Sequence, residues 1–218
     1  MRSSAATRLR RGNLRWWLVY GPVRSGTTLM GNLIADHARW QVSDWGLHAA
    51  LAGPLGVRRR DYDDVPPRRA LLGEVLDACE TGNKGPVDVV YKQANIRRPE
   101  VEALESVLGP TERRIFCHRD PAAFMRSATK MFKDTDLDEL RVNNYIGTID
   151  EHARVGGEVF LYHPHVTGED YASFLRPLAI SDAAKATVRY SGSTADELTT
   201  PAMWEAYERL AAVAVNTA

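Results

Sequence analysis

The fold is decided by residues 16–37, which read WWLVYGPVRSGTTLMGNLIADH. The five apolar residues 16–20 predict a short buried strand. The glycine-bounded segment 21–26 predicts a turn, and a helix is expected from Thr27 to His37. A strand, a glycine-bounded loop and a helix in this order predict a cradle for an anion, because the loop N–H groups and the helix N-terminus point toward the bound group.

The loop departs from the nucleotide-binding P-loop at one position. That pattern, GxxxxGK[ST], has a lysine where this chain has Thr27. The cation lies three positions upstream, at Arg24. Two glycines, a cation and the hydroxyls of Thr27 and Thr28 still meet at one helix start, which predicts a site for phosphate or sulfate groups.

Strands and helices alternate along the rest of the chain. Further strands are expected at 87–91, 114–118 and 158–162, and helices at 67–80, 99–108, 121–133, 136–155, 167–178 and 201–213. Asp120 is expected to cap the helix at 121–133, with Pro121 at its first position. Residues 41–66 are expected to be irregular. Helices between strands imply parallel pairing, so the pattern predicts an α/β fold of three layers and P-loop type, with a central parallel sheet flanked by helices. Its ligand site is expected where the loops 21–26, 92–96 and 119–120 meet.

The composition is that of a globular protein with balanced charge. The chain has 218 residues, 28 basic and 28 acidic, so the net charge favours neither a nucleic acid nor a membrane as partner. No apolar run approaches the roughly 20 residues of a membrane span. Two cysteines are too few for a disulfide framework, and a cytoplasmic location is expected. Residues 1–15 hold five arginines and no acid and are predicted to be a flexible basic tail before a single domain at 16–218.

Two motifs in this order resemble those of the PAPS-dependent sulfotransferases, where PAPS is 3′-phosphoadenosine 5′-phosphosulfate. The loop resembles the family's 5′-phosphosulfate-binding loop, and the residues it contributes are Arg24, Ser25, Gly26, Thr27 and Thr28. After the strand at 114–118, Arg119-Asp120-Pro121 and then Ser127 resemble the family's 3′-phosphate-binding motif. The resemblance implies a small soluble bacterial sulfotransferase. Such an enzyme transfers a sulfuryl group from PAPS to a hydroxyl, less often an amine, of a small-molecule acceptor and releases PAP, the desulfated nucleotide.

The chemistry of PAPS suits these residue types. A phosphomonoester carries nearly two charges, which the planar guanidinium of Arg119 can bind in a bidentate manner, and Ser127 adds a hydroxyl about two turns into its helix. When the sulfuryl group leaves, charge develops on the bridging oxygen, and Arg24 with the loop amides can stabilise it. The sulfuryl group carries less charge than a phosphoryl group, so the electrostatics require no metal.

The family also implies a lysine and a base. Lys92, at the end of the strand at 87–91, stands where the family often has a lysine that contacts the transferred group. The cytosolic branch has a basic histidine two residues later, where this chain has Ala94. The base is therefore expected elsewhere: Asp44, beside Trp45, is the first candidate and His48 the second.

Weaker expectations concern the remaining residues. Arg189 is the nearest substitute for a C-terminal segment that the family uses on the 3′-phosphate. His118 is interpreted as a packing residue or a satisfied core histidine, and His152 as a surface residue. The acceptor pocket is expected between residues 41–66 and the helix around Tyr145.

Two other functions remain open. The glycine loop also fits an ATP-dependent kinase of small molecules or nucleotides, and the missing histidine fits a non-catalytic nucleotide-binding protein. Arginine outnumbers lysine 23 to 5, which is typical of GC-rich bacteria and favours a secondary metabolite as acceptor. A monomer or a homodimer is expected.

Overall fold

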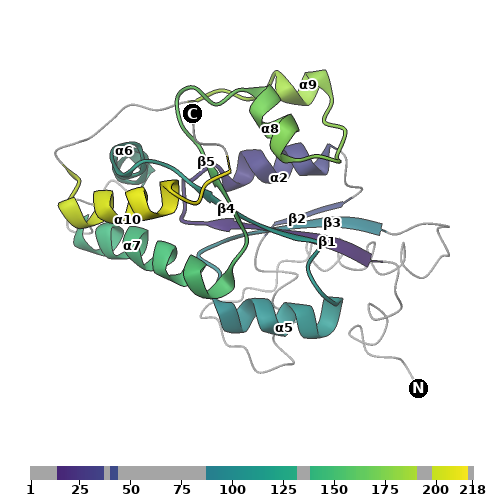
Figure 1. Cartoon of the computed structure of the whole chain (residues 1–218), viewed down its shortest axis with the longest axis horizontal. Helices are drawn as coiled ribbons and strands as arrows, with labels where there is room; N and C mark the ends of the chain where they lie inside the picture. Colours follow the sequence, from purple (N-terminus) through teal and green to yellow (C-terminus); the bar gives the residue numbers. More distant parts are fainter. Residues whose placement is uncertain (1–13, 37–39, 44–86, 132–137, 191–197, 216–218) are drawn as a thin grey trace.

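A five-stranded parallel sheet forms the centre of the molecule (Figure 1). The computed structural model describes residues 14–36, 40–43, 87–131, 138–190 and 198–215. The strands are β1 (Leu14–Gly21), β2 (Trp40–Ser43), β3 (Val87–Ala94), β4 (Arg113–His118) and β5 (Glu158–Leu161). Their order is β2-β3-β1-β4-β5, and every neighbouring pair is parallel. The predicted α/β fold with a central parallel sheet is confirmed.

Helices cover both faces of this sheet and complete the predicted three layers (Figure 1). Their bounds are α2 (Thr27–Ala35), α5 (Arg98–Leu108), α6 (Pro121–Met131), α7 (Asp138–Val155), α8 (Gly168–Phe174), α9 (Asp182–Lys185) and α10 (Pro201–Ala211). Among the described residues, none of these helices is both long and apolar enough to cross a membrane.

Strand β1 divides the hydrophobic core in two, because its side chains alternate between the faces of the sheet. Trp16, Leu18 and Tyr20 pack against α5, α6, α7 and α10. Trp17 and Val19 pack against α2 and α8 on the other face. These five side chains are at most 4% exposed, as expected for a central strand with helices on both sides.

The start of the segment after the first helix was predicted incorrectly, and residues 44–66 lie outside the described residues. Residues 41–66 were expected to be irregular, but Trp40–Ser43 forms the edge strand β2 and pairs with β3 from Val89 to Lys92. Four residues are too short to give a clear pattern, and the partner strand lies more than forty positions away. The helix expected at 167–178 also ends early, at Phe174, and the short helix α9 was not predicted.

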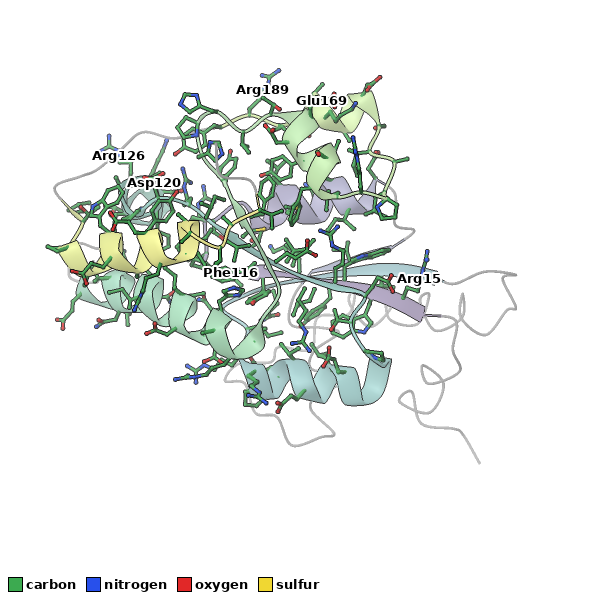
Figure 2. The ribbon with its side chains drawn as sticks, in the orientation of Figure 1. Arg15, Phe116, Asp120, Arg126, Glu169 and Arg189 are labelled. Carbon is green, nitrogen blue, oxygen red and sulfur yellow. The ribbon has the colours of Figure 1, made fainter. Side chains whose placement is uncertain are left out.

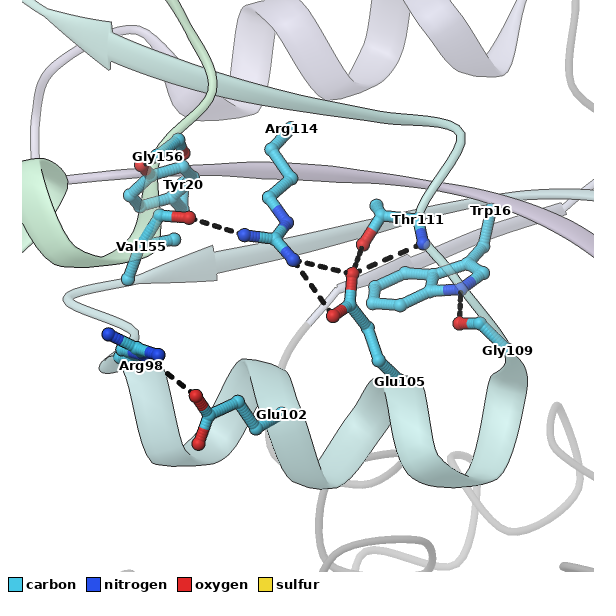
Figure 3. A network of polar contacts seen from close by, with 10 residues as sticks. All are labelled: Trp16, Tyr20, Arg98, Glu102, Glu105, Gly109, Thr111, Arg114, Val155 and Gly156. Atoms are coloured by element: carbon cyan, nitrogen blue, oxygen red, sulfur yellow. Dashed lines mark hydrogen bonds and ion pairs between the residues drawn. The ribbon is translucent and has the colours of Figure 1, made fainter.

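A polar network fastens α5 to the amino end of β4 (Figure 3). Arg114 donates from Nη2 to both carboxylate oxygens of Glu105, at 2.7 and 2.8 Å, and from Nη1 to the carbonyl of Val155. The hydroxyl of Thr111 also donates to Glu105. Burial alone would raise the pKa of Glu105, but the hydrogen bonds from Thr111 and Arg114 hold it below its usual range. This network lies at the amino end of β4, whereas Arg119 and Asp120 follow its carboxyl end.

His152 was expected on the surface, and this prediction was wrong. Its ring stacks on Phe116, with the ring centroids 4.4 Å apart, and its Nδ1 lies 2.7 Å from the hydroxyl of Tyr20. That hydroxyl also donates to the carbonyl of Gly156 at 2.7 Å. Burial lowers the pKa of His152. The histidine therefore helps to join the end of α7 to the sheet.

Candidate anion-binding site

The loops that follow β1 and β3 lie side by side at the carboxyl end of the sheet. Gly21 pairs with Ala94 at the last position of the β1–β3 register, and the N–H of Asn95 donates to the Gly21 carbonyl at 2.9 Å. A side chain at Gly21 would come within 2.1 Å of the carbonyl oxygen of Cys117, the penultimate residue of β4. The three loops that were expected to face one site therefore begin next to one another.

The loop between β1 and α2 has the backbone of an anion cradle. Arg24 and Gly26 have φ angles of +67° and +90°. Alternation of left-handed with right-handed residues turns successive N–H groups toward one point. A left-handed arginine costs about 1 kcal/mol or more, a strain that proteins retain mainly at functional loops. A Cβ at Gly26 would lie 3.2 Å from the ring of Tyr162, so this glycine also allows Tyr162 to pack against the loop.

The hydroxyl groups of the loop have different roles. Ser25 is fully buried and its hydroxyl donates to the carbonyl of Pro22 at 2.7 Å, so it closes the loop from inside. Thr27 is also buried, at 5% exposure, whereas Thr28 is exposed. Of the two predicted hydroxyl ligands, Thr28 faces solvent, whereas Thr27 is buried like Ser25.

Two cationic side chains, Lys92 and Arg24, connect the loop to neighbouring elements. Lys92, near the end of β3, donates to the hydroxyl of Thr28 at 3.2 Å. Arg24 extends in the other direction and donates from Nε to the hydroxyl of Ser127 on α6 at 2.9 Å. The two motifs that the sequence placed 103 positions apart are thus in direct contact.

The guanidinium of Arg119 is buried beside two aromatic rings that pack against each other. The side chain is 3% exposed, and its Cζ lies 5.4 Å from the ring centre of Tyr162 and 5.2 Å from that of Tyr190. Nη1 donates to the carbonyl of Arg24 at 3.2 Å. Nε and Nη2 have no hydrogen-bond partner among the described residues. A buried charge with unpaired donors is costly, and a bound anion would remove that cost.

Asp120 does not neutralise this arginine. Its Oδ1 accepts from the N–H of Ala123 at 2.8 Å and caps α6, as the sequence predicted, and its Oδ2 lies 3.4 Å from the hydroxyl of Tyr190. Within the described residues, no carboxylate forms an ion pair with Arg119. Figure 2 shows Asp120 on the side of the molecule where α6 and α10 lie.

The side chains of Tyr145 and His118 both contact the backbone carbonyl of Arg119. Tyr145 is completely buried and donates to the Arg119 carbonyl at 2.8 Å. The acceptor pocket expected between residues 41–66 and the helix around Tyr145 stays a prediction, because residues 44–66 lie outside the described residues. The Nδ1 atom of His118 lies 3.0 Å from the same carbonyl. Burial lowers the pKa of His118 to about 3. His118 is a core residue whose ring packs against Phe116 and Tyr145, which confirms the interpretation as a packing residue, while its Nε2 has no hydrogen-bond partner among the described residues.

The remaining predicted residues are placed as follows. The side chain of Arg189 is exposed and projects from the molecular surface in Figure 2, while its carbonyl accepts from the hydroxyl of Tyr162 at 2.6 Å. Asp44 and His48 lie outside the described residues, so their role as base stays a prediction. The structure adds Tyr162 and Tyr190 to the site. No sequence pattern indicated these two residues, because their contact with Arg119 depends on the fold alone.

Comparisons with known proteins leave the family of this chain open. No protein-family model matches it, and no curated protein is significantly similar to it. One similar solved structure is an unliganded sugar kinase from Janibacter sp. HTCC2649, with 13% identity and a TM-score of 0.32. The match covers 56% of this chain and 68% of the kinase chain. A similarity of this size carries no argument about activity, which has to rest on the site itself.

Proposed function

We propose that this protein is a sulfotransferase that moves a sulfuryl group from PAPS to a hydroxyl, less often an amine, of a small-molecule acceptor. The observation that carries the proposal is the buried guanidinium of Arg119, which has two unpaired donors beside a loop shaped to hold an anion. Arg24 and Lys92 add two more cations at the same edge of the sheet. Such a site suits a ligand with two separate anionic groups.

The reaction divides among the groups of the site. Arg119 and Ser127 bind the 3′-phosphate, and the loop amides with the N-terminus of α2 bind the 5′-phosphosulfate. The acceptor oxygen attacks sulfur, the bond from sulfur to the bridging oxygen breaks, and PAP leaves with the electron pair. The loop N–H groups stabilise the charge that develops on that oxygen, and Lys92 neutralises a sulfuryl oxygen. The acceptor proton passes to a base, for which Asp44 and His48 remain the candidates.

One observation favours a second function, an ATP-dependent kinase of small molecules or nucleotides. Lys92 brings to the loop the cation that Thr27 does not provide, so the loop could hold a triphosphate. However, the Thr28 hydroxyl stands at the position where a P-loop uses it to bind Mg²⁺, and here it accepts from the ammonium group. This contact favours a donor that is bound without a metal. A bacterial secondary metabolite remains the proposed acceptor class.

Thermal unfolding in the presence of nucleotides tests the proposal against the kinase. PAP in excess over its Kd is expected to raise the Tm, because it binds the folded state alone, whereas ATP with Mg²⁺ is expected to leave the Tm unchanged. The opposite result would support the kinase. Transfer of labelled sulfate from PAPS to any member of an acceptor panel would then exclude a protein that binds the nucleotide without catalysis.

A further inference from the structure

The peptide that leads from β4 into α6 is held by two buried side chains. The hydroxyl of Tyr145 donates to the carbonyl of Arg119 at 2.8 Å, and Nδ1 of His118 lies 3.0 Å from the same oxygen. Both side chains are fully buried. We infer, resting on the proposed function, that His118 and Tyr145 are positioning residues, which fix the place from which the Arg119 guanidinium binds the donor nucleotide.

The protonation states of the two side chains make both of them donors. Burial raises the pKa of Tyr145, so its hydroxyl keeps the proton that it donates. Burial lowers the pKa of His118 to about 3, so its ring is neutral at pH 7 and carries one proton. Because a carbonyl oxygen only accepts, that proton lies on Nδ1. Two donors use both lone pairs of the oxygen and fix the plane of the peptide between Arg119 and Asp120.

Packing alone does not explain a histidine at this position. The Nε2 atom of His118 is buried without a hydrogen-bond partner among the described residues, which costs free energy that an apolar side chain would not cost. The ring packs against Phe116 and Tyr145, contacts that a leucine could also make. The hydrogen bond to the carbonyl of Arg119 is the contact that a leucine could not make.

The end of β4 also holds the guanidinium of Arg119. The carbonyl of His118 accepts from the N–H of Tyr162 at 2.7 Å, and the ring centre of Tyr162 lies 5.4 Å from the Cζ of Arg119. Nη1 of Arg119 donates to the carbonyl of Arg24 at 3.2 Å. A side chain that is already held at both ends loses less entropy when it binds an anion, so these contacts should raise the affinity for the donor.

Isothermal titration of PAP into paired variants separates positioning from packing. His118→Leu keeps an apolar side chain of similar size but removes the donor, whereas His118→Asn leaves a cavity and keeps an N–H near the place of Nδ1. Tyr145→Phe removes the other donor. Tyr20→Phe is the matched control, because Tyr20 is buried in the same core and its hydroxyl also donates to a backbone carbonyl, that of Gly156.

We expect His118→Leu and Tyr145→Phe each to weaken PAP binding about threefold to tenfold, the value of one hydrogen bond, while His118→Asn stays within about twofold of the wild type. Urea unfolding of the same preparations should give the opposite order at residue 118, with asparagine less stable than leucine because of the cavity. Tyr20→Phe should lower the stability and leave the Kd of PAP unchanged.

A second background shows whether the effect passes through Arg119. In Arg119→Met, the further change His118→Leu should alter the Kd of PAP less than about twofold, because the arginine that the histidine positions is gone. The same factor in both backgrounds, or a Kd of PAP that follows stability across the variants, would overturn the inference and leave the proposed function intact. A wild-type protein that does not bind PAP would overturn both.

Discussion

The ammonium group of Lys92 donates to the hydroxyl of Thr28 at 3.2 Å, across 64 positions of the chain. β3 lies beside β1 in the sheet, so the carboxyl end of β3 delivers this lysine to the start of α2. Lys92, on a neighbouring strand, thus supplies the positive charge that a P-loop has at the position of Thr27. The contact also places Lys92 at the part of the loop where the transferred group of PAPS is proposed to bind.

Removal of the Lys92 charge is expected to affect transfer more than binding. PAP has no sulfuryl group, so Lys92→Met should change the Kd of PAP less than about threefold, while the rate of sulfate transfer from labelled PAPS should fall about a hundredfold or more. Lys130→Met is the matched control, because Lys130 is exposed in the last turn of α6. Equal transfer rates for the two variants would show that Lys92 has no catalytic role.

The two tyrosine rings beside Arg119 are expected to position its guanidinium. Tyr190→Leu removes one ring and should weaken PAP binding about threefold to tenfold, the range of a partly buried cation–π contact. Tyr190→Phe keeps the ring, loses the hydroxyl that contacts Asp120 at 3.4 Å and lies beside the Arg119 side chain, and should bind PAP like the wild type if the ring is the important group. If Tyr190→Phe loses as much affinity as Tyr190→Leu in the same titration, the hydroxyl and not the ring is the important group.

The sequence predicted the parts of the site that local chemistry determines. The glycine loop, the start of α2 and the helix cap at Asp120 follow from residue types within a few positions of one another. The contacts Arg24–Ser127 and Lys92–Thr28 could not be predicted, because side-chain direction depends on packing between distant elements. The same reason explains the error at His152, whose helix face is chosen by the sheet and not by its own sequence.

The stability of the protein is expected to fall in mild acid. Burial lowers the pKa of His118 from about 6.5 to about 3, and that of His152 in the same direction. Between these pH values the unfolded chain binds more protons than the folded one. The stability that the neutral histidines contribute is therefore present above pH 6.5 and is lost as the pH falls toward 3. At pH 5 the loss from His118 is about 2 kcal/mol. Urea unfolding of wild type and His118→Asn from pH 7 to pH 5 should give a shallower decline for the variant. Equal slopes would contradict the buried, neutral state of His118.

The network at the other end of the sheet is expected to affect stability alone. Glu105→Gln weakens the two hydrogen bonds from Arg114 and should lower the free energy of unfolding by about 1–2 kcal/mol. The Kd of PAP should stay the same, because Glu105 contacts the amino end of β4 and the site lies at the carboxyl end. Urea unfolding and a PAP titration on the same preparation measure both effects. A tenfold change in the Kd of PAP would mean that the two ends of the sheet are coupled.

Equilibrium dialysis of PAP with the wild type, Arg119→Lys and Arg119→Met tests the central claim most directly. We expect the wild type to bind one PAP per chain. Arg119→Lys should weaken binding at least tenfold, since an ammonium group cannot make the bidentate contact, and Arg119→Met should weaken it further. Wild-type affinity for PAP in Arg119→Met would contradict the claim that the buried guanidinium is the phosphate ligand.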